Sequence, residues 1–322
     1  MEKENKVAAP VVSPTATAAT AATATAAPIQ PAAPAFRIEA SRQRRRYLNG
    51  LFYGDYGVGK TTLVATASEV PSMRAVLYVN AEGGDASIES FDLDTVTVSN
   101  YAQFARVHDF LRVHCKLRDI YLAAEDYKGA SAATREEARL KLLKHEAHFR
   151  GVDPAALSKA EPTLYHTVII DTLTEVQKYC MYQLLGIRVG EFALDSVPDA
   201  PELSEWNRAA EMIRILIRSY RDLSINALFV CARDESQDQQ KRYHYAPMLP
   251  GKLGREVRGF FDVVGYMVAA LTEGGEVHRR LWLEPGQTFH AKNRFRSFTE
   301  RYIDNPSMAD LAKYALKAPN ER

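Results

Sequence analysis

The 322-residue sequence predicts an α/β fold with a mostly parallel central sheet that is flanked by helices. From residue 47 onward, runs of β-forming residues alternate with helical stretches, which is typical of a parallel sheet covered by helices. A glycine-rich motif separates the first predicted strand from the first predicted helix, and a glycine pair separates two late extended runs. The first feature predicts a phosphate-binding turn, and the second predicts C-terminal antiparallel hairpins that complete the sheet.

The predicted strands fall into two groups along the chain. The first group alternates with helical stretches and comprises residues 47–53, 75–81, 95–98, 167–171 and 226–232. The second group follows residue 262 and is expected to be antiparallel, with extended runs at residues 263–268, 277–283 and 288–291. Gly274 and Gly275 provide the turn between the first two of these runs.

Three segments flank or interrupt a predicted core of residues 37–305. Residues 1–36 are dominated by Ala, Thr and Pro, so we expect a disordered tail. Residues of about 119–160 exceed what a crossover between two strands needs, and we expect a helical insertion that projects from the core as a hairpin. Residues 306–322 are expected to form a C-terminal helix or tail.

Two small clusters in these segments have more than one interpretation. The basic run Arg42 to Arg46 precedes the first strand and either contacts phosphates of a nucleic acid or is a solvated charge run. His145 and His148 are three residues apart in the predicted insertion and share a helix face. No third ligand is evident nearby, so the pattern favours a solvated face over a metal site.

Bulk composition excludes few functions but restricts the compartment. A formal net charge of +1 excludes neither nucleic acid nor protein partners, since a local basic patch can be offset elsewhere. Cys115, Cys180 and Cys231 are far apart, which indicates reduced thiols rather than a disulfide framework or a zinc site. No apolar run approaches the roughly 20 residues that span a bilayer, and no export signal is evident. We therefore expect a cytoplasmic protein without a membrane partner.

Residues 54–62, with the sequence GDYGVGKTT, match the P-loop motif G-x-x-x-x-G-K-[ST] between a predicted strand and a predicted helix. The glycines allow consecutive N–H groups to surround the β- and γ-phosphates, while Lys60 reaches their oxygens and Thr61 ligates Mg²⁺. An ordinary glycine-rich turn is the alternative, but the strand-loop-helix context favours the P-loop. No guanine-specific N-K-x-D motif is present. The sequence thus predicts ATP and Mg²⁺, bound through Gly54, Asp55, Tyr56, Gly57, Val58, Gly59, Lys60, Thr61 and Thr62.

Two acidic residues near strand ends complete the predicted chemistry. Asp171 ends the apolar run 167–171, where its carboxylate would lie beside the P-loop and hold Mg²⁺ through water; the alternative is a cap of the next helix. The residue after Asp171 is Thr172, so no acid stands beside it to activate water. Glu82 follows the second strand instead, where it could polarise a water in line with the γ-phosphate.

The glutamate after the second strand, the Asp-Thr pair at residues 171 and 172 and the terminal hairpins together resemble the RecA-like branch of P-loop ATPases. More closely, the segments YGDYGVGKTT, NAEGG, VIIDTLTE and PGKLGREV look like those of phage-encoded single-domain RecA-core ATPases. These are AAA-domain nucleotide-binding proteins associated with single-strand annealing and recombination. The resemblance covers roughly residues 47–300 and includes neither the tail nor the helical insertion. It implies a RecA-like P-loop NTPase fold.

The resemblance also implies residue roles and shows two departures. Glu82 matches the catalytic glutamate of the RecA-like pattern, and Asp171 matches its magnesium-associated aspartate. Asn80 stands where an aspartate is common, which matters little if that position is structural. The strand at residues 226–232 lacks the glutamine that senses the γ-phosphate, so Arg233 becomes the candidate sensor.

The segment 234–258 occupies the position of the DNA-binding loop in RecA-like proteins. Basic residues alternate there with aromatic ones, which suits phosphate contacts and base stacking on a single strand. A mobile surface loop without DNA contact is the alternative that composition leaves open. The candidate DNA-binding residues are Lys241, Arg242, Tyr243, Tyr245, Lys252 and Arg255.

Lys292 and Arg294 form a K-x-R pair at the end of a late predicted strand, where alternation places both on one face. In hexameric helicases that resemble this core, such a pair reaches the γ-phosphate of the neighbouring subunit. The catalytic set would then be Lys60 and Glu82 of one subunit with Lys292 and Arg294 of the next, in a ring or a filament. An exposed basic strand end is the alternative.

Three functions fit these observations. The leading hypothesis is an oligomeric, Mg²⁺-dependent ATPase that acts on single-stranded DNA in phage-type recombination, annealing or repair. A hexameric DNA translocase or helicase-like motor shares the core and the K-x-R pair. A nucleotide-gated scaffold would instead recruit replication or recombination proteins through the insertion at 119–160, with little or no hydrolysis.

Overall fold

The structure is a computed structural model that describes residues 47–84, 86–126, 132–157, 160–188 and 200–316. All of these residues belong to the unit Arg42–Arg322. The predicted tail at 1–36, the basic cluster Arg42 to Arg46 and the end of the predicted C-terminal segment lie outside the described residues.

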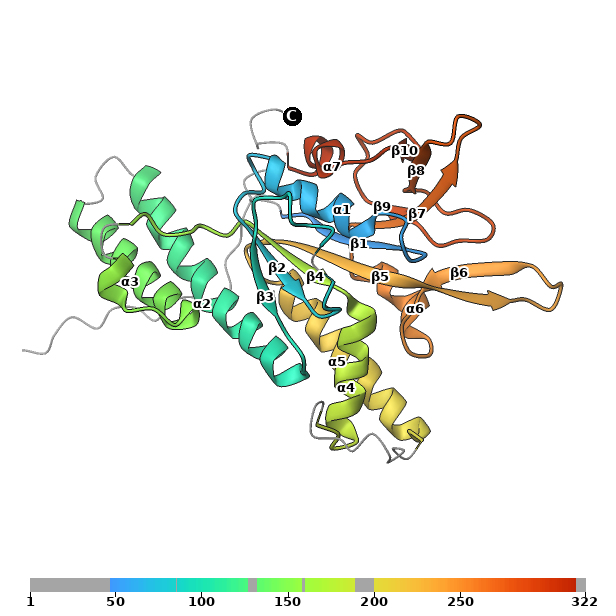
Figure 1. The fold of residues 1–322 in the computed structure, drawn as a ribbon, viewed down its shortest axis with the longest axis horizontal. Coiled ribbons are helices and arrows are strands. Elements are labelled where there is room, and N and C mark those ends of the chain that lie inside the picture. The colour runs from blue at the N-terminus through green and yellow to red at the C-terminus, as the bar shows by residue number, and fades with distance from the viewer. Residues whose placement is uncertain (1–46, 85, 127–131, 158–159, 189–199, 317–322) are drawn as a thin grey trace, which may run out of the picture. The chain divides into compact units, whose positions relative to one another are not determined.

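The centre of the fold is a sheet with the strand order β10-β8-β7-β1-β5-β4-β2-β3 (Figure 1). Strands β7, β1, β5, β4, β2 and β3 are parallel, while β8 and β10 extend the β7 side as antiparallel strands. β6 and β9 pair antiparallel with β5 and β7. The bounds are β1 (Asn49–Gly54), β2 (Val76–Asn80), β3 (Asp94–Thr97), β4 (Thr167–Asp171), β5 (Asn226–Gln237), β6 (Tyr243–Pro247), β7 (Val263–Leu271), β8 (Val277–Trp282), β9 (Lys292–Asn293) and β10 (Tyr302–Asp304).

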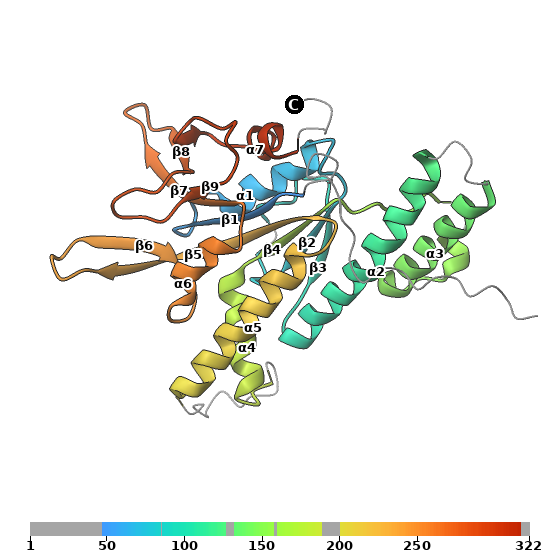
Figure 2. The ribbon, with the colours of Figure 1, turned by 180° about the vertical axis from the view of Figure 1, so that it is seen from behind.

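Helices cover both faces of the sheet, as Figure 2 shows from behind. α1 (Lys60–Ala65), η1 (Thr66–Glu69) and α7 (Met308–Ala315) lie on one face. α2 (Tyr101–Asp126), α4 (Leu173–Leu184) and α5 (Leu203–Arg221) pack on the other. The remaining helical elements are α3 (Ala132–Arg150), η2 (Pro154–Leu157), α6 (Leu253–Glu256) and η3 (Val257–Gly259).

Alternation along each buried strand divides the core into two layers. In β1, Leu51 and Tyr53 face the α2, α4 and α5 layer, whereas Phe52 faces the α1 and α7 layer. Successive side chains of a strand point to opposite faces, so a strand covered on both sides must be apolar throughout. All six residues of β1 and all five of β4 are buried. The continuous apolar runs in the sequence are therefore a consequence of a sheet covered on both faces.

The predicted helical insertion is formed by α2 and α3, which pack against each other and extend away from the sheet (Figure 1). A small separate core of Tyr121, Ala138 and Leu142 joins the two helices. α2 continues without a break through residue 119, so one helix serves both the crossover and the insertion. The predicted α/β architecture, with its parallel sheet, C-terminal antiparallel hairpins and helical insertion, is confirmed.

Two segments differ from their predicted local structure. The segment 234–258, for which a polar loop was the expectation, continues β5 and turns into β6, so it starts as an antiparallel hairpin. The run 288–291, predicted as a strand, pairs only through a bridge between Tyr245 and Phe289, and the strand β9 follows it at Lys292–Asn293. Phe289 of that run packs on the rings of Tyr266 and Trp282 instead of joining the sheet.

Arg118 anchors the insertion to the core. Its side chain is fully buried and donates hydrogen bonds to the carbonyl oxygens of Tyr165, before β4, and Ser224, before β5. It also forms an ion pair of 2.8 Å with Asp119. A buried guanidinium that satisfies carbonyls from two connections fixes the position of α2 over the sheet.

We expect Arg118→Met to lower the free energy of unfolding by about 2–4 kcal/mol, because it removes the donors of one buried and one partly buried carbonyl. Methionine fills similar volume, so the loss reports the hydrogen bonds rather than a cavity. Urea unfolding followed by circular dichroism measures it. The control is Arg112→Met on the same helix, where the arginine side chain is 51% exposed and a change within about 0.5 kcal/mol is expected. Equal effects of the two substitutions would contradict the anchoring role.

Candidate functional site

The carboxyl ends of β1, β4 and β2 meet at one edge of the sheet, because these strands run parallel. β1 ends at Gly54, where the P-loop begins, and β4 ends at Asp171. In the pairing of β2 with β4, Asn80 is opposite Asp171, and the N–H of Ala81 donates to the Asp171 carbonyl at 2.8 Å. Glu82 is the next residue. Strand register thus places Lys60, Asp171 and Glu82 around one opening.

The P-loop depends on glycine at three positions for different reasons. Gly57 and Gly59 have φ angles of 73° and 95°, a left-handed conformation that residues with a Cβ rarely adopt. Gly54 is constrained by space, since a Cβ there would lie 2.3 Å from the backbone oxygen of Met267 on β7. The turn therefore approaches its neighbours closely and leaves the N–H groups of the loop without side chains in front of them.

Lys60 is buried at the base of the loop and contacts the loop itself. Its Nζ donates to the carbonyl oxygens of Asp55 at 2.6 Å and Gly54 at 3.2 Å. Burial lowers the pKa of Lys60, and the negative charges of Asp171 and Glu82 act in the opposite direction. The ammonium group is partly desolvated and close to the loop, which suits it to an anionic ligand.

Asp171 is almost fully buried and links β4 to the P-loop helix. Its Oδ2 accepts hydrogen bonds from Thr61 Oγ1 at 2.6 Å and from Tyr78 Oη at 2.8 Å. Its Oδ1 is buried and has no hydrogen-bond partner within the described residues. Burial raises the pKa of Asp171, although both hydrogen bonds and Lys60 counteract it. An orphaned carboxylate oxygen beside a threonine hydroxyl fits a hard divalent cation, so Thr61 and Asp171 are suited to hold Mg²⁺.

The alternative role for Asp171, a cap of the following helix, is not observed. Thr172 is the N-cap residue of α4, and its hydroxyl accepts from the Glu175 N–H at 3.2 Å. The carboxylate of Asp171 is directed to the P-loop through Thr61. The strand end and the helix start therefore use neighbouring side chains for separate purposes.

Glu82 lies in the turn after β2, and this turn is shaped by its neighbour Asn80. The Asn80 side chain is buried and accepts a hydrogen bond from the Gly83 N–H at 2.8 Å, which agrees with a structural role at this position. The Glu82 carboxylate is exposed and has no hydrogen bond or ion pair within the described residues. Partial burial, together with the charges of Asp171 and Glu175, raises its pKa. A free carboxylate of raised pKa is suited to accept a proton.

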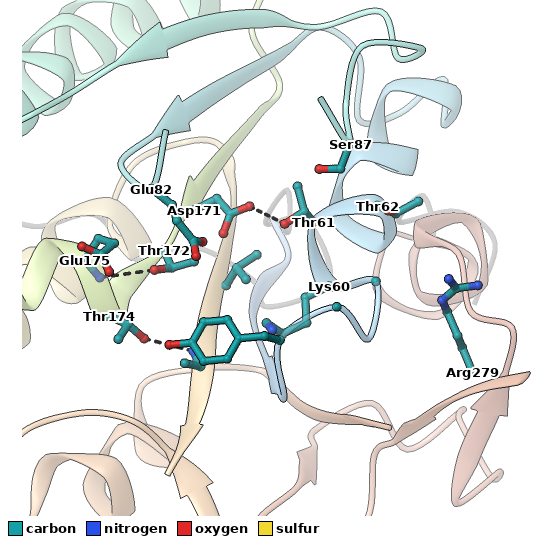
Figure 3. A pocket seen from close by; sticks show the side chains of 15 residues that line it. Lys60, Thr61, Thr62, Glu82, Ser87, Asp171, Thr172, Thr174, Glu175 and Arg279 are labelled. Carbon is teal, nitrogen blue, oxygen red and sulfur yellow. Dashed lines mark hydrogen bonds between the residues drawn. The ribbon is translucent and has the colours of Figure 1, made fainter. Parts of the chain in front are cut away.

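One cavity of about 290 Å³ contains these groups (Figure 3). In this view Glu82, Asp171 and Thr61 lie on one side of Lys60, and Arg279 lies on the other. Of the predicted nucleotide-binding residues, Tyr56, Gly57, Gly59, Lys60, Thr61 and Thr62 line the cavity, whereas Gly54, Asp55 and Val58 support the loop behind it. The other lining residues are Ser87, Thr172, Thr174, Glu175, Val230, Ala232 and Arg279.

Sequence reasoning assigned no role to Ser87, Thr174, Glu175 or Arg279. Glu175 could have been assigned to the site from the sequence, because it lies one helical turn after Asp171. Its carboxylate forms an ion pair of 2.6 Å with Lys178. Thr174 is a structural neighbour, since its hydroxyl accepts the Ala232 N–H at 3.0 Å. Arg279 gives no local signal, because β8 is more than 200 residues from the P-loop in sequence.

Arg233, the predicted γ-phosphate sensor, is not among the residues that line the cavity. It lies on β5 and forms an ion pair of 2.9 Å with Asp55 of the P-loop. Its guanidinium carbon is 4.5 Å from the centroid of the Tyr245 ring on β6. Arg233 thus connects the outer side of the P-loop to the β5–β6 hairpin.

The candidate DNA-binding residues are distributed over two elements. Lys241, Arg242 and Tyr243 lie near the end of the β5–β6 hairpin, which projects from the sheet in Figure 1. Lys241 and Tyr243 are exposed, while Arg242 forms an ion pair of 2.8 Å with Asp238.

The other members of this predicted set lie closer to the sheet. Tyr245 is at the hairpin base, where it stacks on Tyr266 with ring centroids 5.8 Å apart. Lys252 is the N-cap residue of the short helix α6 after the hairpin, and Arg255 lies within that helix. The six residues therefore do not form one continuous stripe along the hairpin.

Lys292 and Arg294 are engaged within their own chain, away from the residues of the cavity. Lys292 Nζ donates to the carbonyl oxygens of Arg258 at 2.6 Å and Phe261 at 2.9 Å. Arg294 contacts Asp262 at 3.2 Å and the Gly259 carbonyl at 2.9 Å. Neither side chain lines the cavity of the same chain.

Comparison with protein families matches residues 46–295 to the AAA domain. This chain belongs to the AAA domain family. The match covers the P-loop, both acidic strand ends and the β5–β6 hairpin. The α/β fold with a mostly parallel sheet that the sequence predicts is confirmed, and the family match together with the P-loop identifies a P-loop NTPase domain.

Two solved structures are similar over most of the chain. The flagellar accessory protein FlaH from Methanocaldococcus jannaschii is 11% identical, with a TM-score of 0.34 and coverage of 81% of this chain and 86% of FlaH. The RadB recombinase is 15% identical, with a TM-score of 0.37 and coverage of 81% and 87%. No curated protein matches the chain.

Two further observations concern the described part of the chain as a whole. None of its helices has both the length and the apolar character that crossing a bilayer requires. It also contains no cluster of three or more His, Cys, Asp or Glu side chains arranged to hold a metal ion. His145 of the insertion stacks on Phe110, with ring centroids 4.9 Å apart.

We expect Asp171→Asn to raise the melting temperature of the nucleotide-free protein at neutral pH. A carboxyl group whose pKa is raised by folding destabilises the folded state once it is ionised. This cost is absent below the unfolded-state pKa and grows as pH rises through the raised folded-state pKa. The gain from asparagine should therefore disappear as pH falls below that window, while Mg²⁺-dependent nucleotide binding weakens at neutral pH.

Differential scanning calorimetry between acidic and neutral pH measures the effect on stability. Asp109→Asn, which removes the same charge from an aspartate that is 65% exposed, is the control and should change the melting temperature little. A lower melting temperature for Asp171→Asn at neutral pH would show that the ionised carboxylate stabilises the fold.

Proposed function

We propose that this protein is a Mg²⁺-dependent ATPase that acts on single-stranded DNA in phage-type recombination, annealing or repair, in the cytoplasm of the host cell. The observation that carries the enzymatic part is one cavity that combines Lys60, Asp171 and Glu82. The first two supply a cation and an Mg²⁺ ligand for a nucleoside triphosphate. Glu82 supplies an unpaired carboxylate that accepts a proton from the water that attacks the γ-phosphate.

Binding of the triphosphate uses groups that already face the cavity. Gly57 and Gly59 carry no side chain of their own that would cover the loop N–H groups, and Lys60 would exchange its loop carbonyls for phosphate oxygens. Thr61 and Asp171 are the residues that would hold Mg²⁺, which neutralises charge on the phosphates when it is bound.

Glu82 is the group that we assign to proton transfer. Its position after β2 puts it at the same edge as Asp171 but outside the buried hydrogen-bond network, so its carboxylate is accessible to water. The raised pKa makes it a better proton acceptor than an ordinary glutamate. Glu175 is less suited to this task because Lys178 already pairs with it.

The proposed contact with single-stranded DNA relies on the β5–β6 hairpin. Lys241 and Tyr243 near its end combine a basic group with an exposed aromatic ring, the pair that phosphate contact and base stacking require. Arg233 joins the base of the hairpin to Asp55 of the P-loop, which supports communication between DNA and nucleotide. The likeness of the motifs to phage-encoded annealing and recombination ATPases supports the biological role.

We expect Glu82→Gln to lower the turnover number at least about a hundredfold while ATP affinity changes little, because only proton transfer is removed. Lys60→Ala should lose binding as well as turnover. In the wild type, turnover should fall at acidic pH, with the midpoint above the usual range of a glutamate, since its raised pKa must be exceeded for ionisation. Phosphate release and fluorescent-nucleotide binding measure the two quantities separately.

The same assay distinguishes the three functional hypotheses when it is run without DNA, with single strands and with duplex. Stimulation by single strands supports the proposal, and Tyr243→Ala should reduce that stimulation without changing DNA-free turnover. Directional strand displacement would favour a translocase or helicase-like motor. Nucleotide binding without turnover, and without any effect of DNA, would favour a scaffold that acts through the α2–α3 insertion.

We further propose a ring or filament in which Arg294 and Lys292 of one subunit complete the site of the next. Arg294→Ala subunits should then lose turnover but regain part of it when mixed with Lys60→Ala subunits, because some interfaces combine an intact Lys60 with an intact Arg294. Turnover of the mixture, with co-assembly verified by light scattering, measures this. Absence of any recovery in mixed assemblies would exclude a contribution from the neighbour.

A further inference from the structure

Arg279 points to the P-loop side of the sheet because of its place in β8. Leu281, two residues later on the same face, is fully buried in the apolar cluster that also contains Leu63 of α1 and Met308 of α7. Arg280 lies on the opposite face, where its side chain contacts Asp304 and Tyr302. Its Nε pairs with Asp304 at 2.7 Å, and its guanidinium stands 3.9 Å from the centroid of the Tyr302 ring. Two adjacent arginines thus have different environments.

The backbone of Arg279 is held on both sides by one residue. The Arg279 N–H donates to Asn305 Oδ1 at 3.0 Å, and the Asn305 N–H donates to the Arg279 carbonyl at 2.7 Å. Asn305 has a φ of 45°, a left-handed conformation that asparagine tolerates better than most residues. The side chain of Arg279 therefore extends toward the P-loop from a fixed point.

The guanidinium reaches the P-loop at its last glycine. An ideal Cβ on Gly59 would lie 2.7 Å from Arg279 Nε and 3.1 Å from its Cδ. The same Nε is buried and has no hydrogen-bond partner among the described residues. Burying a charged donor without an acceptor costs free energy, and an anionic ligand beside Arg279 Nε would remove that cost. The cavity that Arg279 lines is the one that holds Lys60 and Thr62.

We infer that Arg279 binds the α-phosphate of the nucleoside triphosphate, within the same chain that supplies the P-loop. This inference rests on the proposed nucleotide site. In Figure 3 Arg279 and Thr62 lie on the side of Lys60 away from Glu82 and Asp171, which mark the hydrolysed end of the triphosphate. The guanidinium fork matches two phosphate oxygens, and the side-chain-free Gly59 allows them to approach. Arg279 is thus a ground-state binding residue, unlike the proposed Arg294 contact from a neighbouring subunit.

The test is the affinity of Arg279→Gln for ATP, ADP and inorganic tripolyphosphate in Mg²⁺, measured by titration calorimetry. All three carry a phosphate at the inferred position, so each should bind roughly tenfold to a hundredfold more weakly than to the wild type. Arg279→Lys keeps the charge without the fork and should be intermediate. The KM for ATP should rise by a similar factor, because the contact is present before and during the reaction.

The outcomes separate this inference from its alternatives. Weakened ATP binding with unchanged ADP binding would place Arg279 at the γ-phosphate, and unchanged tripolyphosphate binding would place it at the base; either result overturns the α-phosphate contact. Unchanged affinity for all three overturns it as well. If the wild type binds none of them, the proposed nucleotide site itself is wrong. Arg301→Gln, which removes a charge from a 71% exposed side chain, controls for net charge and should bind as the wild type does.

Discussion

The P-loop, Asp171 and Glu82 all depend on the parallel orientation of β1, β4 and β2. Because the three strands share a direction, their carboxyl ends deliver the P-loop, Asp171 and Glu82 to one edge of the sheet. The orientation is stabilised by two apolar layers on opposite faces, so residues of the core fix the positions of charged residues that they do not contact. A one-residue slip of β2 against β4 would reverse the face of each β2 side chain and displace Glu82.

Lys60 and Asp171 are buried in the cavity, where desolvation disfavours the charged form of each side chain. Burial lowers the pKa of Lys60 and raises the pKa of Asp171, so desolvation acts against both charged forms. Their mutual attraction and the hydrogen bonds from Thr61 and Tyr78 offset only part of that cost, and Asp171 Oδ1 is left without a partner. Such a site gains most from a ligand that brings phosphate and a divalent cation together, since these charges replace the missing water.

Sequence alone was sufficient where one local pattern determines one local structure. The P-loop motif lies between a strand and a helix that the sequence pattern predicts, and Asp171 ends an apolar run typical of a buried strand. Glu82 was placed at the same edge because it directly follows the second predicted strand. It was insufficient where a contact joins distant segments. Arg279 reaches Gly59 only because β8 extends the β7 side of the sheet, and nothing near residue 279 indicates that pairing. The polar segment after residue 233 was expected to be a loop, but β6 pairs with the extension of β5 over five residue pairs and makes it an ordered hairpin.

Arg233 connects the P-loop to the β5–β6 hairpin but does not contact the nucleotide cavity. A side chain that senses the γ-phosphate directly must enter the cavity, and Arg233 does not line it. Instead it holds the carboxylate of Asp55, while the carbonyl of the same residue accepts the Lys60 ammonium. Any ligand that draws Lys60 away from the loop therefore alters the residue to which the hairpin is attached. Since Arg233 also packs over Tyr245 of β6, Asp55 and Arg233 connect Lys60 to the hairpin without a γ-phosphate contact by Arg233.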